Sequence, residues 1–363
     1  MNEKVLKQEE KIIWALRSVY HKYGYTSYEM SKFEDYEFYI RNKDFLVSDR
    51  VIAFSDTNGK MLALKPDVTL SIIKSGKDVP GTKQKVYYNE NVYRVSKTTH
   101  RYSEIMQAGL ECIGDIGFYD VFEVISLAAE SLHQVSENFS LVISHLDILS
   151  DILKAASDSP QFQKDAVGLI AQKNPHDLLK LCEQYKVSEE KTQAVLALTK
   201  VYGERNSVIE RIRPFAGKAQ MEELQKLSDY LTLSPYSDNI QFDFSVVDDM
   251  NYYNGFLFKG FVDGVSSEIL SGGQYDNMMR KINRTSSAIG FAIYLDLLDQ
   301  NVPGEEYDFD VLLLYDERND ALPVARKVRE LTEKGLSVSA QKVVPAKLRF
   351  KEIVDMRGEG QDA

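Results

Sequence analysis

Six polar residues stand inside stretches of this sequence that are otherwise apolar or helix-forming. They are Asp67, Thr69, Gln107, Glu111, Tyr252 and Tyr253. Gln107 and Glu111 lie four residues apart in the run EIMQAGLECIG, so a strand there places both side chains on one face. The tyrosine pair follows two aspartates in VVDDMNYYNGFLF (246–258), which we interpret as a strand, a turn and a second strand. Three separate segments thus offer polar groups to a common site.

The chemistry of these side chains suits a small ligand. A buried carboxylate is costly unless it is paired, so Glu111 within an apolar strand predicts a cationic partner. Taken singly, each residue is better explained as part of an internal salt bridge or, for Asp67, as an acid at a helix start. Together, carboxylates, an amide and phenols match a ligand that carries an ammonium group and a hydrogen-bonding ring.

Motifs that would indicate a catalytic centre are missing from the sequence. It contains no P-loop, GxGxxG, HExxH or GxSxG pattern, and its five histidines are scattered. The two cysteines, Cys112 and Cys182, lack metal-ligand spacing and are expected to be reduced thiols. We therefore predict no catalytic residue, no metal site and no cofactor.

Length and charge set further limits. A chain of 363 residues predicts two or three structural units, and a net charge of −11 disfavours nucleic acid as the main ligand. The N-terminal MNEKVLKQEEKIIWAL lacks a signal-peptide core, and no apolar run reaches the about 18 residues that span a bilayer. We expect a cytoplasmic protein without membrane contact.

Hydrophobic periodicity predicts the elements that would position the polar residues. In the first part of the chain we expect helices at 9–24, from Pro66 to about 77, and at 119–135, a hairpin at 52–64 around Asn58-Gly59, and strands at 84–97 and 103–113. Residues 146–236 have helical period almost throughout. Strand patterns return at 240–246, 255–262 and 267–271, followed by a strand-to-helix passage at 286–300.

This order predicts an α+β fold whose antiparallel sheet is interrupted in sequence by helices. We assign the core to 1–145 and 237–302, a helical insertion to 146–236, and a short α/β segment to 303–363. In that last segment we expect a strand at 308–316, a helix at 319–334 and a strand at 336–341.

Several motifs, in order, resemble the class II core of histidyl-tRNA synthetases over most of residues 1–300. LALKPDVT (62–69) is similar to LALRPExT, and VYRVSKTTHRYSEIMQAGLECIG to the second class II motif, with Arg94 as its arginine and a QxGxE segment. NYYNG resembles D-Y-Y-T-G, SGGQYDNM (271–278) resembles GGRYDxL, and AIGFAIYLDLL (288–298) resembles the third class II motif. The fold implied is a class II synthetase-like antiparallel sheet flanked by helices.

The resemblance also implies roles for the polar residues. Asp67, Thr69 and Gln107 would hold the amino group of histidine, and Arg94 belongs to the same histidine-binding set. Glu111 and Tyr253 would recognise the imidazole, with Tyr252 nearby.

Departures from the synthetase pattern argue against the synthetase reaction. Asp248 stands where the synthetases place an arginine that contacts the amino-acid carboxylate and the phosphate during adenylation. Leu297 stands where another arginine clamps ATP. Asp249 and Tyr294 replace glycines, and Ser31 replaces the proline of the first motif. Adenylation develops charge that cationic clamps stabilise, so these changes predict that it is lost.

This pattern of losses is similar to that of the regulatory subunits of ATP phosphoribosyltransferase, which are synthetase paralogues. The resemblance implies a non-catalytic chain that binds free histidine for feedback control of the first step of histidine biosynthesis. Its implied partner is the short-form catalytic subunit, with a homodimer of this chain inside a hetero-oligomer, a hetero-octamer in the family. The tail (303–363) resembles the start of an anticodon-binding domain. Alternatives are a divergent histidyl-tRNA synthetase or another histidine-binding paralogue.

Overall fold

The computed structural model describes residues 6–43, 46, 51–76, 78–95, 100–250, 252–298, 307–317 and 321–357. They belong to two compact units, Met1–Gln300 and Asn301–Ala363. The helical segment 146–236 belongs to the first unit. The expected boundary between residues 302 and 303 and the polar residue Asn251 lie outside the described residues.

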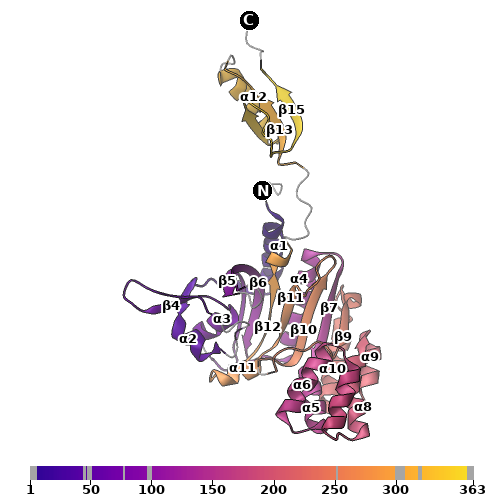
Figure 1. The fold of residues 1–363 in the computed structure, drawn as a ribbon. Helices are drawn as coiled ribbons and strands as arrows, with labels where there is room; N and C mark the ends of the chain where they lie inside the picture. Colours follow the sequence, from indigo (N-terminus) through magenta and orange to yellow (C-terminus); the bar gives the residue numbers. More distant parts are fainter. Residues whose placement is uncertain are drawn as a thin grey trace. The chain divides into compact units, whose positions relative to one another are not determined.

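A nine-stranded sheet organises the first unit, in the order β1-β5-β6-β12-β11-β10-β7-β9-β8 (Figure 1). Its strands are β1 (Thr26–Ser27), β5 (Lys83–Val95), β6 (Tyr102–Gly114), β7 (Phe139–His145), β8 (Tyr202–Gly203), β9 (Ile240–Asp243), β10 (Asn254–Val262), β11 (Leu270–Gln274) and β12 (Ser287–Tyr294). The central pairs β5–β6, β6–β12, β12–β11, β11–β10 and β10–β7 are antiparallel. The α+β prediction is confirmed.

The two faces of the sheet carry different partners. Helices α1 (Gln8–Lys22) and α4 (Phe118–Val135) pack on one face, where Leu110 and Cys112 of β6 are buried. The other face carries α3 (Thr69–Ser75) and α11 (Asp276–Lys281), and there Glu111 of the same strand points. The alternation along one strand therefore separates an apolar core from a polar site.

A second, three-stranded sheet has the order β2-β4-β3 and includes the expected hairpin. Its strands are β2 (Phe33–Asp35), β3 (Ala53–Ser55) and β4 (Met61–Leu64). Gly59 of the turn has a φ of 80°, a conformation that Asn-Gly turns favour. The hairpin prediction is confirmed.

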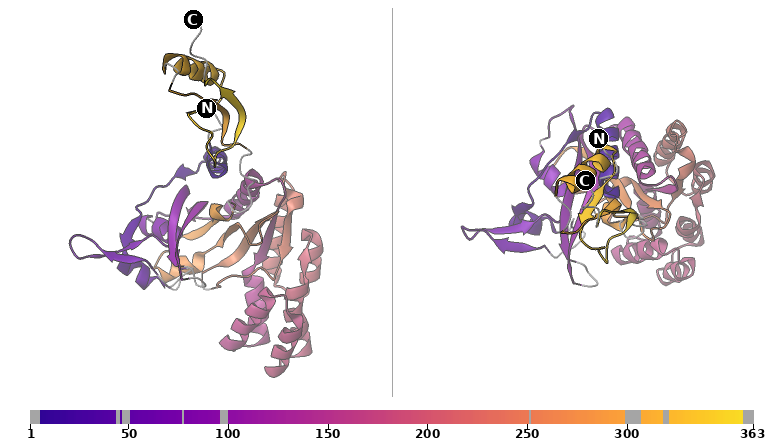
Figure 2. Two further views of the ribbon diagram at one scale, coloured as in Figure 1. Left: turned by 45° about the horizontal axis from the view of Figure 1, so that its top comes forward. Right: turned by 90° about the horizontal axis from the view of Figure 1, so that it is seen from above.

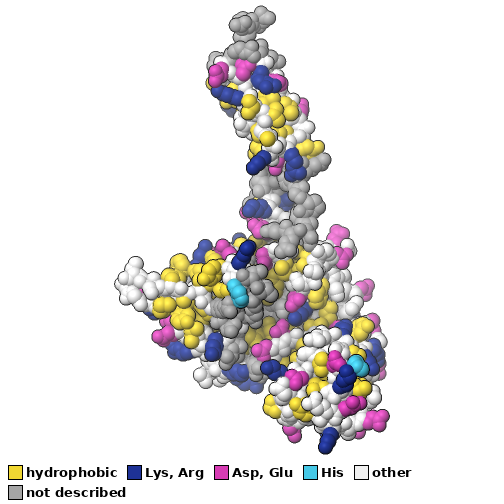
Figure 3. Space-filling model, viewed as in Figure 1, with side chains coloured by type: hydrophobic (Ala, Val, Ile, Leu, Met, Phe, Trp, Pro, Cys, Tyr) yellow, Lys and Arg dark blue, Asp and Glu magenta, His cyan; other side chains and the backbone are white. Residues whose placement is uncertain are grey.

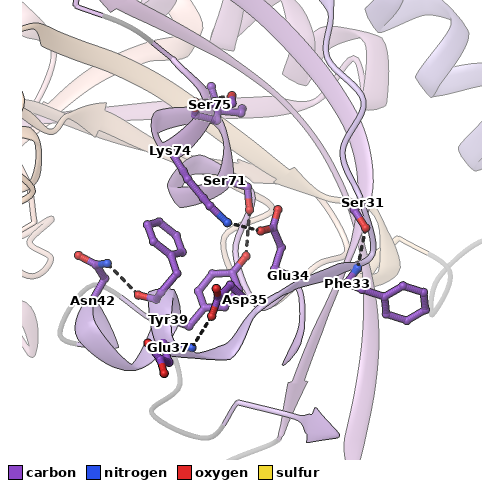
Figure 4. A network of polar contacts seen from close by, with 12 residues as sticks. Ser31, Phe33, Glu34, Asp35, Glu37, Tyr39, Asn42, Ser71, Lys74 and Ser75 are labelled. Carbon is purple, nitrogen blue, oxygen red and sulfur yellow. Dashed lines mark hydrogen bonds and ion pairs between the residues drawn. The ribbon is translucent and has the colours of Figure 1, made fainter. Parts of the chain in front are cut away.

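The segment that follows Ser31, the expected position of the first class II motif, contains α2 (Tyr36–Arg41) and contacts α3. The buried Tyr39 hydroxyl lies 2.9 Å from the Ser71 hydroxyl, and the Lys74 ammonium lies 2.8 Å from the Glu34 carboxylate (Figure 4). Ser31, at the expected proline position, accepts a backbone N–H with its hydroxyl. These contacts fix α3, whose first residue reaches the polar site.

Helices gather at the β7–β9–β8 end of the sheet (Figure 2). They are α5 (Leu146–Ala156), α6 (Pro160–Ala171), α7 (Pro175–Gln184), α8 (Glu189–Lys200), α9 (Arg205–Ile212) and α10 (Lys218–Leu231), followed by the 3-10 helix η3 (Ser237–Asn239). Pro160 and Pro175 begin helices, behind the capping residues Ser159 and Asn174. Basic and acidic side chains are interspersed on the face of these helices that Figure 3 shows. The helical period predicted these elements, but not the short strand β8.

The second unit contains a parallel sheet in the order β14-β13-β15 and helix α12. Its elements are β13 (Phe309–Leu314), α12 (Ala321–Glu333), β14 (Val338–Gln341) and β15 (Phe350–Asp355). A small core joins Val311 and Leu313 of β13 to Val324 and Leu331 of α12. The predicted β-α-β unit is present, and β15 is an additional strand that the periodicity did not predict.

Two further expectations are corrected by the described residues. Helix α3 begins at Thr69 rather than at Pro66, because the Asp67 carboxylate accepts the Leu70 N–H at 2.8 Å and ends the preceding extended segment. Residues 244–250 and 252–253 form turns and loop rather than a first strand, and the regular strand begins at Asn254. The site residues before β10 are therefore held by a loop.

Candidate functional site

All seven residues predicted from the sequence line one cavity on the α3 side of the large sheet. They are Asp67, Thr69, Arg94, Gln107, Glu111, Tyr252 and Tyr253. The cavity has a volume of about 160 Å³, against the roughly 10–15 Å³ that one water molecule requires. The segments thus meet as the sequence predicted, and the space between them admits a small polar molecule.

Glu111 lies at the buried end of the cavity. Its side chain is 2% exposed and accepts hydrogen bonds of 2.6 Å from the Thr69 and Tyr275 hydroxyls, one at each oxygen. Among the described residues it forms no ion pair, and two hydroxyl donors stabilise this carboxyl group; the expected cationic partner is not one of these residues. Burial, together with nearby Asp67, raises the pKa of Glu111 to about 8 although both hydroxyls lower it. At neutral pH the group is therefore mostly protonated.

Two glycines make room for this arrangement. A Cβ on Gly290 of β12 would lie 1.7 Å from the Glu111 Oε2 atom. A Cβ on Gly109 of β6 would lie 2.6 Å from the Tyr88 hydroxyl and 2.3 Å from a backbone oxygen. Only residues without a side chain fit beside the carboxyl group and the phenol, which explains the glycines in the QAGLE and AIGFA stretches.

Gln107 lies two residues before Gly109 on the same face of β6 and is 3% exposed. Its side-chain amide lines the cavity and forms no hydrogen bond within the described part of the chain. An amide in the cavity wall can both donate to and accept from a ligand that carries hydrogen-bonding groups. Gln107 thus adds a polar contact to the carboxyl group and the phenols around it.

Asp67 and Arg94 lie together near the start of α3. The Arg94 guanidinium donates to the Pro66 carbonyl at 3.1 Å. Burial raises the pKa of Asp67, while the Leu70 N–H and the charge of Arg94 lower it. Asp67 therefore serves both as the acid before a helix and as a wall of the cavity.

Four tyrosines form an aromatic wall. The rings of Tyr252 and Tyr253 are 4.5 Å apart, and Tyr252 lies 5.9 Å from Tyr275. Burial raises the pKa of these three phenols and of Tyr88 well above the usual value, so all four remain neutral. Neutral phenols both donate and accept hydrogen bonds, as a heterocyclic ring requires.

Tyr275 and Tyr88 are functional candidates that sequence reasoning missed. Tyr275 stands in the quoted SGGQYDNM motif, directly after β11, and its position two residues after a Gly-Gly pair was the available indication. Tyr88 is a buried residue of β5 between the less buried Tyr87 and Asn89, and its sequence context gave no such indication. Both are 2% exposed and contact the cavity.

The opposite end of the cavity is acidic. Asp248 and the exposed Asp249 line it, and the Asp248 carboxylate lies 3.5 Å from the Lys259 ammonium. The same two aspartates and Tyr253 also line a larger open groove of about 860 Å³ beside α5 and α6. The cavity therefore opens, at its acidic end, towards the helical segment.

The two residues that depart from the third class II motif, Tyr294 and Leu297, have different surroundings. Tyr294 lines the cavity at the end of β12, and burial raises the pKa of its phenol. Leu297 ends the 3-10 helix η4 (Leu295–Leu297) and packs against the main core.

Within the described residues, no helix is long and apolar enough to cross a membrane, and no three metal-ligating side chains are grouped.

Comparison with known proteins places this chain in one family. The histidyl-tRNA synthetase family model matches residues 1–298. The ATP phosphoribosyltransferase regulatory subunit of Oceanobacillus iheyensis is 28% identical over 340 residues, covering 90% of this chain and 84% of the relative. The regulatory subunit of Acetivibrio thermocellus is 26% identical over 343 residues, covering 89% and 80%.

Solved structures share the fold. An ATP phosphoribosyltransferase regulatory subunit/histidyl-tRNA synthetase from Bacillus halodurans aligns with a TM-score of 0.77 at 23% identity, covering 97% of this chain and 94% of that one. A chain of the ATP phosphoribosyl transferase (HisG:HisZ) complex from Thermotoga maritima aligns with a TM-score of 0.63 at 20% identity, covering 78% and 96%. The class II synthetase-like fold is thus confirmed, and this chain belongs to the histidyl-tRNA synthetase family, within which it resembles the regulatory subunits of ATP phosphoribosyltransferase.

Proposed function

We propose that this chain is a non-catalytic regulatory subunit of ATP phosphoribosyltransferase that binds free histidine. The observation that carries the proposal is the cavity itself: it unites an amide, a buried carboxyl group and neutral phenols, while an aspartate stands at its open end. The first set suits an amino acid with a ring; the aspartate does not suit a phosphate. The assignment to ATP phosphoribosyltransferase rests on the names of the relatives.

Histidine would bind with its ammonium group towards Asp67, Thr69 and Gln107 and its imidazole towards Glu111 and Tyr253. Arg94 and Tyr252 complete the proposed histidine-binding set. A protonated Glu111 beside a neutral imidazole holds the same number of protons as a carboxylate beside an imidazolium. In either form the carboxyl group and the ring can share a hydrogen bond, so binding near neutral pH requires no net uptake or release of a proton.

Loss of adenylation follows from the charges at the reaction end. Among the described lining residues, Arg94 is the cation, and Asp67, Asp248 and Asp249 are acids. Phosphoryl and adenylyl transfer need cations aimed at the developing negative charge, whereas a carboxylate there opposes it. Leu297, at the second expected arginine position, is packed in apolar surroundings.

The proposed partner is the short-form catalytic subunit, which would supply the phosphoribosyl chemistry in the cytoplasm. This chain would act as a homodimer within a hetero-oligomer, a hetero-octamer by analogy with the family. Feedback is then a coupling between the histidine cavity on one chain and the catalytic site on another.

Reconstitution tests this function. The purified chain should form a complex with the catalytic subunit and make its phosphoribosyl transfer sensitive to histidine. The Glu111→Ala variant should still assemble but lose that sensitivity. Histidine-dependent ATP–pyrophosphate exchange by the chain alone should be absent; observing it would establish the divergent synthetase and overturn the proposal.

A further inference from the structure

The cavity changes character from its buried end to its mouth. Glu111, Tyr275, Tyr88 and Gln107, at the buried end, are each at most 3% exposed. At the mouth, Asp248 is partly exposed and Asp249 is exposed. A ligand that inserts a ring at the buried end must therefore present its remaining group to two aspartates.

Among the described residues that line the cavity, acids outnumber cations around that remaining group. The described lining residues include Asp67, Asp248 and Asp249 against Arg94, whose side chain already faces Asp67 and donates to a backbone carbonyl. Lys259 is nearby, but its ammonium is shared between Asp248 at 3.5 Å and Glu268 at 3.1 Å. A free carboxylate at the mouth would meet like charges at short range, which costs most where water is partly excluded.

The ammonium end has the opposite preference. The carboxylates that repel an anion attract a cation, and the Gln107 amide in the cavity wall can offer its carbonyl oxygen to an ammonium N–H. The ligand that matches the whole lining is thus a positively charged imidazole amine without a carboxylate charge.

Space at the mouth permits a neutral extension. Asp248, Asp249 and Tyr253 line both the cavity and the open groove of about 860 Å³. A substituent on the carboxyl carbon could pass between the aspartates into this groove, whose lining includes amides, hydroxyls and charges of both signs. The groove therefore has room for an amide or ester that passes beyond the two aspartates.

We propose that the cavity prefers imidazole amines whose carboxyl group is absent or neutralised as an amide or ester over free histidine. This inference rests on the proposed imidazole-binding role of the same site and specifies its ligand class. Histidine binds through its ammonium and ring, and its carboxylate weakens rather than strengthens the complex.

Calorimetric titration of the full-length protein at neutral pH with histidine, histidinamide and histamine tests the preference. We expect histidinamide and histamine each to bind at least tenfold more tightly than histidine. Tight binding by both shows that loss of the charge is sufficient, and tighter binding by histidinamide than by histamine shows that the groove also accepts the carbonyl extension. Histidine binding as tightly as, or more tightly than, both analogues overturns the inference but leaves the proposed function standing. No heat from any of the three overturns the proposed function as well.

Two substitutions assign the effect to the mouth. Asp248→Asn should raise the affinity for histidine several-fold and reduce the advantage of histamine, because it removes one repulsive charge. Asp147→Asn is the matched control, since Asp147 lines the groove but not the cavity, and its selectivity should equal that of the parent. Equal selectivity in parent and Asp248→Asn would contradict the electrostatic explanation.

Discussion

The Tyr275 hydroxyl donates a 2.6 Å hydrogen bond to Glu111 from a position 164 residues further along the chain. Both side chains are 2% exposed, and the bond joins the residue before α11 to the last part of β6. This contact orients the carboxyl group on which the proposed recognition of the imidazole depends. It also shows how a site on the face of a sheet is assembled from segments that are distant in sequence.

Tyr275→Phe should weaken histidine binding about tenfold, because Glu111 loses the donor that orients it. The free energy of unfolding should fall by about 1 kcal/mol, as expected for one buried hydrogen bond. Tyr20→Phe is the matched control: it removes a buried hydroxyl that lies 2.9 Å from the Ser131 hydroxyl in the main core and does not line the cavity. It should lower stability similarly but leave affinity unchanged. Equal affinities in the two variants would contradict the positioning role.

Glu111 should make the stability of the protein depend on pH. Its pKa is raised from 4.5 to about 8 in the folded state, so between these values the folded protein retains a proton that the unfolded chain releases. The free energy of unfolding therefore decreases as pH rises from about 4.5 to 8, by on the order of a few kcal/mol. Denaturant titrations at pH 5, 6, 7 and 8 should show this decline.

Glu111→Gln supplies the comparison for the pH series. Its unfolding free energy should decline less between pH 5 and 8, because the amide does not titrate while it still offers an oxygen to one hydroxyl. Parallel curves for parent and variant would show that Glu111 has an ordinary pKa.

Lys65 and Glu90 form an ion pair whose amine is fully buried, with 2.6 Å between Nζ and Oε2. Lys65→Met leaves Glu90 without its partner and should lower the unfolding free energy by about 3–5 kcal/mol. The double variant Lys65→Met, Glu90→Leu should recover most of that loss, because no unpaired charge remains. A double variant as unstable as the single one would argue that the pair contributes by packing rather than by charge.

Local sequence patterns were sufficient where the determining contacts are local. The Asn58-Gly59 turn and the shared face of Gln107 and Glu111 follow from backbone geometry, and both predictions are confirmed. The helical period of residues 146–236 was equally informative, since each helix buries one apolar face.

The remaining features depend on contacts that the sequence does not display. Tyr275 reaches Glu111 only through the register of β11, β12 and β6, so two hydroxyls stand where a cationic partner was expected. The loop before β10 resembles a strand in composition. Strand β15 is mostly exposed and carries adjacent charges at Lys351 and Glu352, which hides its periodicity.

Calorimetric titration with histidine of the full-length protein and its Glu111→Ala variant tests the central claim most directly. The parent should give saturable heat, and the variant should bind at least tenfold more weakly. Glu104→Ala is the matched control, because Glu104 lies on β6 outside the cavity, near Asn91 and Tyr93; it should bind as the parent does. No heat from the parent, or an unchanged titration in Glu111→Ala, would contradict the account.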